Sequence, residues 1–239
     1  MMKAMTAGGV DAGPPVIGWA SAFWAGDPMW TPPADGGAVS SWRNGGASGG
    51  DALQATGSRQ PIYNTTTFSG KPGITFDGSD DLLVATLSLG SVYISTVLIG
   101  KLNTTAKNVA MVDLSLGSGT RYVPAMIANE WYARLNGSGS GVAVNVGSAD
   151  TNPHMFSTIG RASGTTLQLS KDGTLIASTT AAGAIPDGPP PSAYIGHGGS
   201  GAASMTIGFF GVYVGDVEAD PKWTPFKAWV RSHYGMTIA

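Results

Sequence analysis

The amino-acid sequence predicts an all-β domain of two packed antiparallel sheets, with one short helix near the C-terminus. Three observations lead to this prediction. Apolar residues recur at every second position over most of the chain, as in strands with a buried face. Turn-forming residues return about every 8–12 positions, the spacing of a sandwich or barrel. Glycine accounts for 36 of 239 residues, about twice its average usage, which indicates many tight turns.

The strands can be placed from their patterns. Ile17, Trp19 and Phe23 are expected on one face of a first strand. Residues 92–99 are apolar on both faces, so that strand should lie in the middle of a sheet covered on both sides. Asp172-Gly173 lies between two apolar runs and predicts a hairpin. A late strand should divide its apolar residues between two faces: Met205, Ile207 and Phe209 on one, and Phe210, Val212 and Val214 on the other.

One segment has the pattern of a helix. Apolar side chains recur at helical spacing from Trp223 to Tyr234. Pro221 suits the first turn of a helix, and Gly235 is a stop signal. We therefore expect a helix over residues 221–234 that docks on the sandwich.

The chain divides into an arm and one domain. Residues 1–14 are small, rich in glycine and without a period, so we expect an extended arm that packs only against a partner. Residues 15–239 contain no linker or convincing repeat and should form a single domain that includes the helix. This size is ordinary, because β-sandwiches often run to about 200–250 residues as one unit.

Composition excludes several functional classes. The chain has no cysteine, which excludes disulfides, thiolate metal sites and cysteine nucleophiles. Charged residues make up 12% and leave a net charge of −2, so the basic surplus of a nucleic-acid-binding protein is absent. No apolar run approaches the roughly 20 residues of a membrane helix, and no apolar signal region follows Met1-Met2-Lys3. We expect no nucleic-acid partner, no membrane insertion and no secretion signal.

A series of motifs in the first third of the chain resembles a known family. The motifs are Val39-Ser40-Ser41-Trp42-Arg43-Asn44, Gln54-Ala55-Thr56, Arg59-Gln60-Pro61, and a block from Gly70-Lys71-Pro72 to Phe76-Asp77-Gly78-Ser79-Asp80-Asp81-Leu82. This order resembles laminin-G-like, concanavalin A-like jelly-roll domains of bacterial and phage proteins, and weaker matches extend over about residues 16–236. The resemblance implies a two-sheet antiparallel jelly-roll sandwich with a short C-terminal helix.

The resemblance also suggests a setting. Such folds host lectins, adhesion modules, glycosidases and structural units, so fold does not decide function. A stand-alone domain without cysteine or signal is most similar to small virion proteins of tailed phages, either minor tail components or capsid decorations. This implies a non-enzymatic structural or adhesion protein at the virion surface, assembled in the host cytoplasm. We expect a homo-oligomer that contacts other virion subunits through residues 1–14, with host-surface glycans as a second candidate partner.

The alternative is a carbohydrate-active protein with a concanavalin-like fold, either a glycoside hydrolase or a carbohydrate-binding module. Hydrolysis needs paired carboxylates, and Asp216, Glu218 and Asp220 would share one face of a strand. The glycosidases of this fold have Glu at the outer positions, whereas this chain has Asp there, and Pro221 ends the strand. We expect a turn and a helix start stabilised by negative charge, and no catalytic residue.

Asp77, Asp80 and Asp81 are candidates for a calcium site, as in some laminin-G-like modules. Calcium takes about six to eight oxygen ligands, and Asp113 could add one if the fold brought it near. An acidic cluster in a turn more often accepts hydrogen bonds from backbone N–H groups. We expect no cofactor, with calcium as the alternative.

Four aromatic residues are candidates for contact with a glycan or a partner. Trp24 and Trp30 lie in a turn-rich segment, and Trp131 and Tyr132 stand at the start of a strand. Aromatic rings stack on the apolar faces of sugars and are enriched in protein interfaces. Ordinary local packing is the alternative for each.

The remaining motifs indicate no chemistry. His154, His197 and His233 lie in separate segments without the spacing of a metal site. Residues 196–201 match G-x-G-x-x-G and residues 46–50 match G-x-S-x-G, but neither has the strand-to-helix context that a dinucleotide site or a nucleophile needs. We expect both to be loops.

Overall fold

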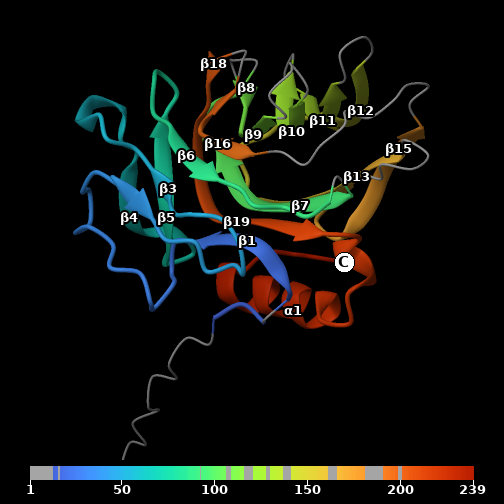
Figure 1. Ribbon diagram of the computed structural model, residues 1–239, viewed down its shortest axis with the longest axis horizontal. Helices are drawn as coiled ribbons and strands as arrows, with labels where there is room; N and C mark the ends of the chain where they lie inside the picture. Colours follow the sequence, from blue (N-terminus) through green and yellow to red (C-terminus); the bar gives the residue numbers. More distant parts are fainter. Residues whose placement is uncertain are drawn as a thin grey trace, which may run out of the picture.

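A computed structural model of the chain describes residues 13–15, 17–91, 93–105, 109–115, 121–127, 130–136, 141–160, 166–180, 191–198 and 201–239. These residues form three layers (Figure 1). Two antiparallel sheets lie one above the other, and a single described helix lies under the lower sheet. We call the sheet next to the helix sheet A and the other sheet B.

The described strands belong to the sheets as follows. Sheet A has the order β15 (Thr174–Thr180), β14 (Thr166–Lys171), β13 (His154–Gly160), β7 (Ile94–Leu102), β19 (Ser204–Val214), β5 (Lys71–Asp77) and β4 (Ile62–Phe68), and β1 (Trp19–Trp24) also pairs with β19. Sheet B has the order β12 (Gly141–Ser148), β11 (Glu130–Asn136), β10 (Arg121–Ile127), β9 (Val112–Ser115), β16 (Ser192–Ile195), β6 (Leu83–Thr86), β3 (Ala52–Leu53) and β2 (Ser41–Trp42), with β8 (Val109–Ala110) beside β10. The remaining elements are the hairpin β17 (His197–Gly198) and β18 (Gly201–Ala202), the 3-10 turns η1 (Gly57–Arg59) and η2 (Val217–Ala219), and helix α1 (Trp223–Tyr234).

This architecture confirms the predicted β-sandwich with a C-terminal helix. Helix α1 begins at Trp223, two residues after the expected start at 221, and ends at Tyr234. Gly235 follows with a φ of 66°, a left-handed conformation that glycine adopts without strain. The predicted hairpin is also present, because Asp172-Gly173 connects β14 to β15. Within the described part of the chain, no helix is long and apolar enough to cross a membrane.

Strand β7 occupies the central position that its sequence predicts. It pairs with β13 on one side and β19 on the other, and Lys101 is its one residue that is not buried. Leu98 faces the other sheet, whereas Val97 and Ile99 face the helix. Val92, at the start of the predicted strand, lies outside the described residues.

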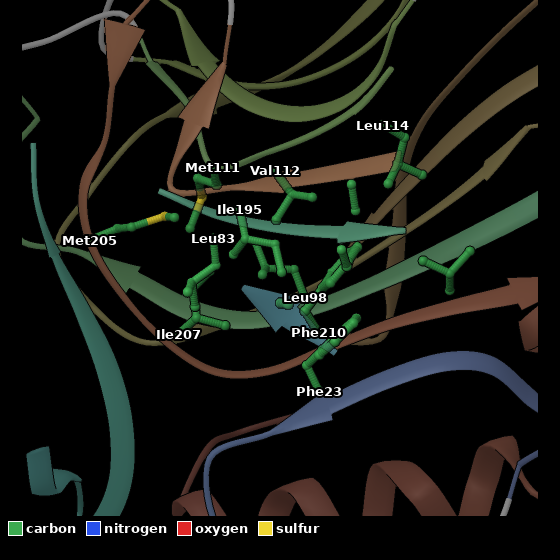
Figure 2. Packing of buried hydrophobic residues seen from close by; sticks show 14 of the residues in the cluster. Phe23, Leu83, Leu98, Met111, Val112, Leu114, Ile195, Met205, Ile207 and Phe210 are labelled. Carbon is green, nitrogen blue, oxygen red and sulfur yellow. The ribbon is translucent and has the colours of Figure 1, made fainter. Parts of the chain in front are cut away.

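The main core lies between the sheets. In Figure 2, side chains from sheet A meet side chains from sheet B. The labelled members include Leu98, Ile207 and Phe210 from sheet A and Leu83, Val112 and Ile195 from sheet B. A second apolar cluster fills the space between the outer face of sheet A and helix α1.

A β-bulge in β1 overturns the predicted arrangement of the first strand. The pairing of β1 with β19 shifts between Trp19 and Ser21, which leaves Ala20 as an extra residue. An extra residue reverses the alternation of faces beyond it. Trp19 therefore packs between sheet A and helix α1, whereas Phe23 lies in the core between the two sheets. The prediction that they share a face was wrong.

A second bulge corrects the prediction for β19 in the same way. The pairing of β19 with β7 shifts between Ile207 and Phe209, so Gly208 is the extra residue. Phe209 turns toward the helix, whereas Phe210 faces the core together with Ile207. Phe209 thus packs between sheet A and helix α1, and Phe210 packs between the two sheets. Both are fully buried.

Gly208 also makes room for the end of the helix. A Cβ atom at this position would lie 2.8 Å from Cε1 and 2.9 Å from the hydroxyl oxygen of Tyr234. The ring of Tyr234 therefore sits directly over the bulge. The absence of a side chain at position 208 allows the last turn of α1 to reach sheet A.

We predict that Gly208→Ala lowers the free energy of unfolding by about 1–3 kcal/mol, because the added methyl group overpacks the space under Tyr234. Urea denaturation followed by fluorescence measures the change. Gly90→Ala is the matched control, since Gly90 is exposed and a Cβ there meets no atom within 4 Å. Equal stability of the two variants would contradict this account of the bulge.

Candidate functional site

A cleft of about 440 Å³ lies over β1 on the side of sheet A that carries the helix cluster. Three segments of the described chain form it: residues 13–18 without residue 16, strand β1 with the turn that follows it, and the loop 43–47. The lining residues that matter below are Trp19, Trp24, Asp27, Arg43, Gly46 and Phe209. Most of the lining is apolar or aromatic, as in many small-molecule sites.

Two indole rings on the floor of the cleft are fixed by the helix. The Trp24 ring meets Trp229 and His233 of α1 edge-on, with 5.6 Å between ring centroids in each pair. The Trp19 ring lies 5.5 Å from Phe226. Both indoles are only 6% exposed, so their positions are set by packing before any ligand arrives.

An ion pair between Asp27 and Arg43 stands at one end of the cleft. One carboxylate oxygen of Asp27 binds the Arg43 guanidinium, and the other accepts a hydrogen bond of 2.8 Å from the Met29 N–H. The Asp27 side chain is 11% exposed and that of Arg43 is 36% exposed. The aspartate is therefore fixed, and the arginine reaches into solvent.

Asn44 holds the loop wall of the cleft against β1. Its side-chain oxygen accepts hydrogen bonds of 2.9 Å from the N–H groups of Ala22 and Gly46. Its amide nitrogen donates to the carbonyl of Ser48 at 2.8 Å. Gly46 lies so close to the strand that a Cβ there would come within 2.5 Å of Ser21 Cα. The G-x-S-x-G match is thus a loop laid flat on β1, as expected.

The predicted aromatic contacts lie in different places. Trp24 lines the cleft. Trp30 is half-buried outside it, edge-on to Tyr63 at 5.6 Å, and donates its indole N–H to the carbonyl of Ser41. Trp131 is 2% exposed and packs against Phe156 in the core, so no face of its ring is open to a ligand. The Tyr132 side chain lies outside the described residues.

The carboxylates at residues 216–220 support a turn, as predicted. Asp216 accepts hydrogen bonds from the N–H groups of Glu218 and Ala219 at the start of η2. Asp220 accepts one from the Lys222 N–H at 2.7 Å, and Glu218 accepts one from the Ser157 hydroxyl at 2.6 Å. Asp216 and Asp220 are thus engaged within the turn, whereas Glu218 ties the turn to strand β13.

The carboxylates of Asp77, Asp80 and Asp81 come together, with ligand atoms within 4.8 Å of one another. Asp81 accepts a hydrogen bond from the Asp77 N–H at 2.8 Å, and Asp77 accepts one from the Ser79 N–H at 2.7 Å. Burial raises the pKa of the Asp81 carboxyl. Asp113 is not part of this group. The contacts are those of a hydrogen-bonded turn, and calcium stays the untested alternative to the expected absence of a cofactor.

His154 ties the Asp172-Gly173 turn to the rest of sheet A. Its Nδ1 lies 2.7 Å from Asp172, and its Nε2 lies 3.0 Å from Asp150. Burial works to raise the pKa of Asp150, but hydrogen bonds from the Asn152 N–H and His154, together with the nearby charges of His154 and Lys171, leave that pKa below its ordinary value. This cluster joins backbone segments and does not line the cleft.

The other glycine motif and the arm can be placed only in part. The expected loop at residues 196–201 contains the short strand β17 and the start of its partner β18, and strand β19 follows it in place of the helix that a dinucleotide site needs. Residues 1–12 lie outside the described residues. Gly13 and Pro14, the last residues of the predicted arm, line the cleft of their own chain.

Comparisons with known proteins show the fold. No family model matches the chain, and no curated protein matches it. Among solved structures, the binding domain of botulinum neurotoxin serotype D/C aligns with a TM-score of 0.59 and 10% identity over 89% of this chain and 52% of that one. The serotype D binding domain aligns with a TM-score of 0.61 and 8% identity over 89% and 51%. This chain thus spans about half the length of these domains.

A third structure matches over most of its own length. Domain 4 of AbnA, a GH43 extracellular arabinanase from Geobacillus stearothermophilus in complex with arabinotriose, aligns with a TM-score of 0.59 and 11% identity over 82% of this chain and 92% of that one. At such identities the similarity establishes a shared β-sandwich fold alone. It leaves the ligand to be argued from the cleft.

Sequence patterns did not identify Asp27 or Arg43 as site residues. Arg43 belongs to a motif of the family resemblance, and Asp27 lies between Trp24 and Trp30. These two segments meet only through the fold. No spacing pattern in the sequence indicates that Asp27 and Arg43 form a pair.

We predict that Asn44→Ala lowers the free energy of unfolding by about 1–3 kcal/mol, because it leaves the partly buried N–H groups of Ala22 and Gly46 without their acceptor. Thermal and urea denaturation measure the change. Asn152→Ala is the control, since Asn152 is exposed. A stability like that of the control would show that the loop does not depend on Asn44.

Proposed function

We propose that this chain is a non-catalytic binding module that holds a glycan in the cleft over β1. The observation that supports this most is the combination of fixed indole rings with one hydrogen-bonding ion pair in a single cleft. Sugars present apolar C–H faces that pack on aromatic rings, and hydroxyl groups that bind charged side chains. A volume of about 440 Å³ lies within the ordinary range of ligand pockets, about 300–1,000 Å³.

The carboxylates argue for binding without hydrolysis. Glycosidases generally flank the scissile bond with two carboxyl groups. Among the described residues that line the cleft, Asp27 is the one carboxylate, and it is paired with Arg43. Asp216 and Glu218, the expected alternative, form part of the η2 turn. An enzyme with this cleft would lack its second catalytic group.

The structural comparisons support a binding role. The similar neurotoxin structures are binding domains, and one of them comes from work on cell entry that depends on interaction with two ganglioside molecules. The arabinanase domain was solved with arabinotriose. Proteins that contain this sandwich thus include binding domains and a domain solved with a sugar, and the cleft over β1 offers this chain a place for such a ligand.

The setting that we propose is the surface of a tailed-phage particle, as a minor tail or capsid decoration protein that contacts host glycans. Its support is the resemblance of residues 39–82 to domains of such proteins. Residues 1–12 of the predicted arm would contact neighbouring subunits in a homo-oligomer, since Gly13 and Pro14 line the cleft of their own chain.

A glycan array tests the binding function, read together with hydrolysis of the same oligosaccharides. We expect binding without turnover, and a loss of affinity of about ten-fold or more in Arg43→Ala, because a charge-assisted hydrogen bond contributes about 1.5–3 kcal/mol. Lys222→Ala is the matched control, since it removes an exposed cation that does not line the cleft. Turnover, an absence of any bound glycan, or full binding in Arg43→Ala would contradict the proposal.

Deletion of residues 1–12 tests the proposed setting. We expect the thermal midpoint to stay within about 2 °C, because a segment this poor in apolar side chains contributes little core, while incorporation into particles falls sharply. Antibodies against the chain should label intact particles. Unchanged incorporation of the truncated chain would show that the arm is not an assembly contact.

A further inference from the structure

We propose that the cleft selects neutral sugars over acidic ones, and that Asp27 and Arg43 together bind a pair of neighbouring hydroxyl groups. This inference rests on the proposed glycan-binding function and names the ligand class of the same site. It follows from the charge balance of the cleft and from the hydrogen-bonding capacity that the ion pair leaves open.

The charges of the cleft cancel. Asp27 and Arg43 are the charged residues among its described lining, and they contact each other directly. The guanidinium therefore does not offer an unbalanced positive charge. A ligand carboxylate that approached Arg43 would also approach the Asp27 carboxylate, and the repulsion between the two anions would offset the attraction to the guanidinium.

The same pair keeps both donors and acceptors available. A carboxylate has about four acceptor positions, and the described contacts of Asp27 are those with Arg43 and Met29. A guanidinium has five N–H donors, and Arg43 NH1 makes its described bond to Asp27. Adjacent hydroxyl groups on a sugar ring match this arrangement, because one can donate to the carboxylate while the other accepts from the guanidinium.

The floor of the cleft favours a ring with an apolar face. Trp19 and Trp24 contribute the partly accessible aromatic lining, each 6% exposed, and helix α1 holds their rings in place. A pyranose or furanose can place its C–H face toward such a floor while its edge hydroxyls reach the ion pair. A free inorganic anion would gain nothing from these apolar walls.

Isothermal titration with two matched oligosaccharides tests the inference, one ending in glucose and the other in glucuronic acid. They differ only in a hydroxymethyl group and a carboxylate. We expect the wild-type chain to bind the neutral member at least about ten-fold more tightly. Deoxy analogues that lack one of two adjacent hydroxyls should lose about ten-fold or more, as expected for a hydrogen bond to a charged group.

Asp27→Asn gives the sharper result, because it keeps the shape of the side chain and an acceptor for the Met29 N–H while removing the negative charge. We expect neutral affinity to fall about ten-fold and acidic affinity to rise, since the Arg43 cation is then unbalanced. Asp80→Asn is the matched control, because Asp80 is exposed and outside the cleft. It removes the same charge and should change neither affinity.

Arg43→Gln provides the reciprocal variant if Asp27→Asn does not fold. It leaves Asp27 as an unbalanced anion, so binding of the acidic member should disappear. Tighter binding of the acidic member by the wild-type chain, or equal effects of Asp27→Asn on both members, would overturn this inference while leaving glycan binding intact. Binding of no sugar at all would overturn the proposed function and this inference with it.

Discussion

Sheet A has to be shielded from water on both of its faces, and the rest of the molecule depends on this constraint. One face packs against sheet B, and the other would expose the side chains of Trp19, Val97, Ile99 and Phe209 if helix α1 did not cover it. Burial of one such side chain contributes about 1.5–3 kcal/mol, so the helix is a part of the core and not an appendage. The two bulges serve the same end, because each moves one aromatic residue to the helix side and keeps its neighbour in the core between the sheets.

The features that could be predicted from the sequence are those that depend on neighbours along the chain. Strand β7 could be placed in the middle of a sheet because both of its faces are apolar, and α1 because its apolar stripe ends at Gly235. The turn at Asp172-Gly173 has its own local signal. The bulges have no such signal, since an extra residue such as Ala20 leaves the apolar pattern almost unchanged. Gly208 is explained by Tyr234, which lies in another element.

In the candidate site, too, residues that are close along the chain could be found from the sequence, whereas residues that only the fold brings together could not. The acidic runs at residues 77–81 and 216–220 are conspicuous in sequence because their members are close along the chain, yet their hydrogen bonds support local turns. Asp27 and Arg43 are inconspicuous, but the fold brings them together at one end of a cleft. Trp131 was a reasonable candidate by residue type, and its burial beside Phe156 depends on the pairing of distant strands. Aromatic residues that bind ligands and those that fill cores cannot be separated by composition.

The cleft and the core share residues, and this sharing limits where binding can be altered. Trp19, Trp24 and Phe209 line the cleft and also hold α1 on sheet A, so replacing any of them changes stability together with the floor of the site. Arg43 and Gly18 have less of this double role, since Arg43 is partly exposed and a Cβ on Gly18 would meet no atom within 4 Å. Ligand preference can therefore be changed at the rim at small cost to folding. In the proposed function, the fixed floor favours a ligand with an apolar face, and the rim residues Asp27 and Arg43 select the polar groups of that ligand.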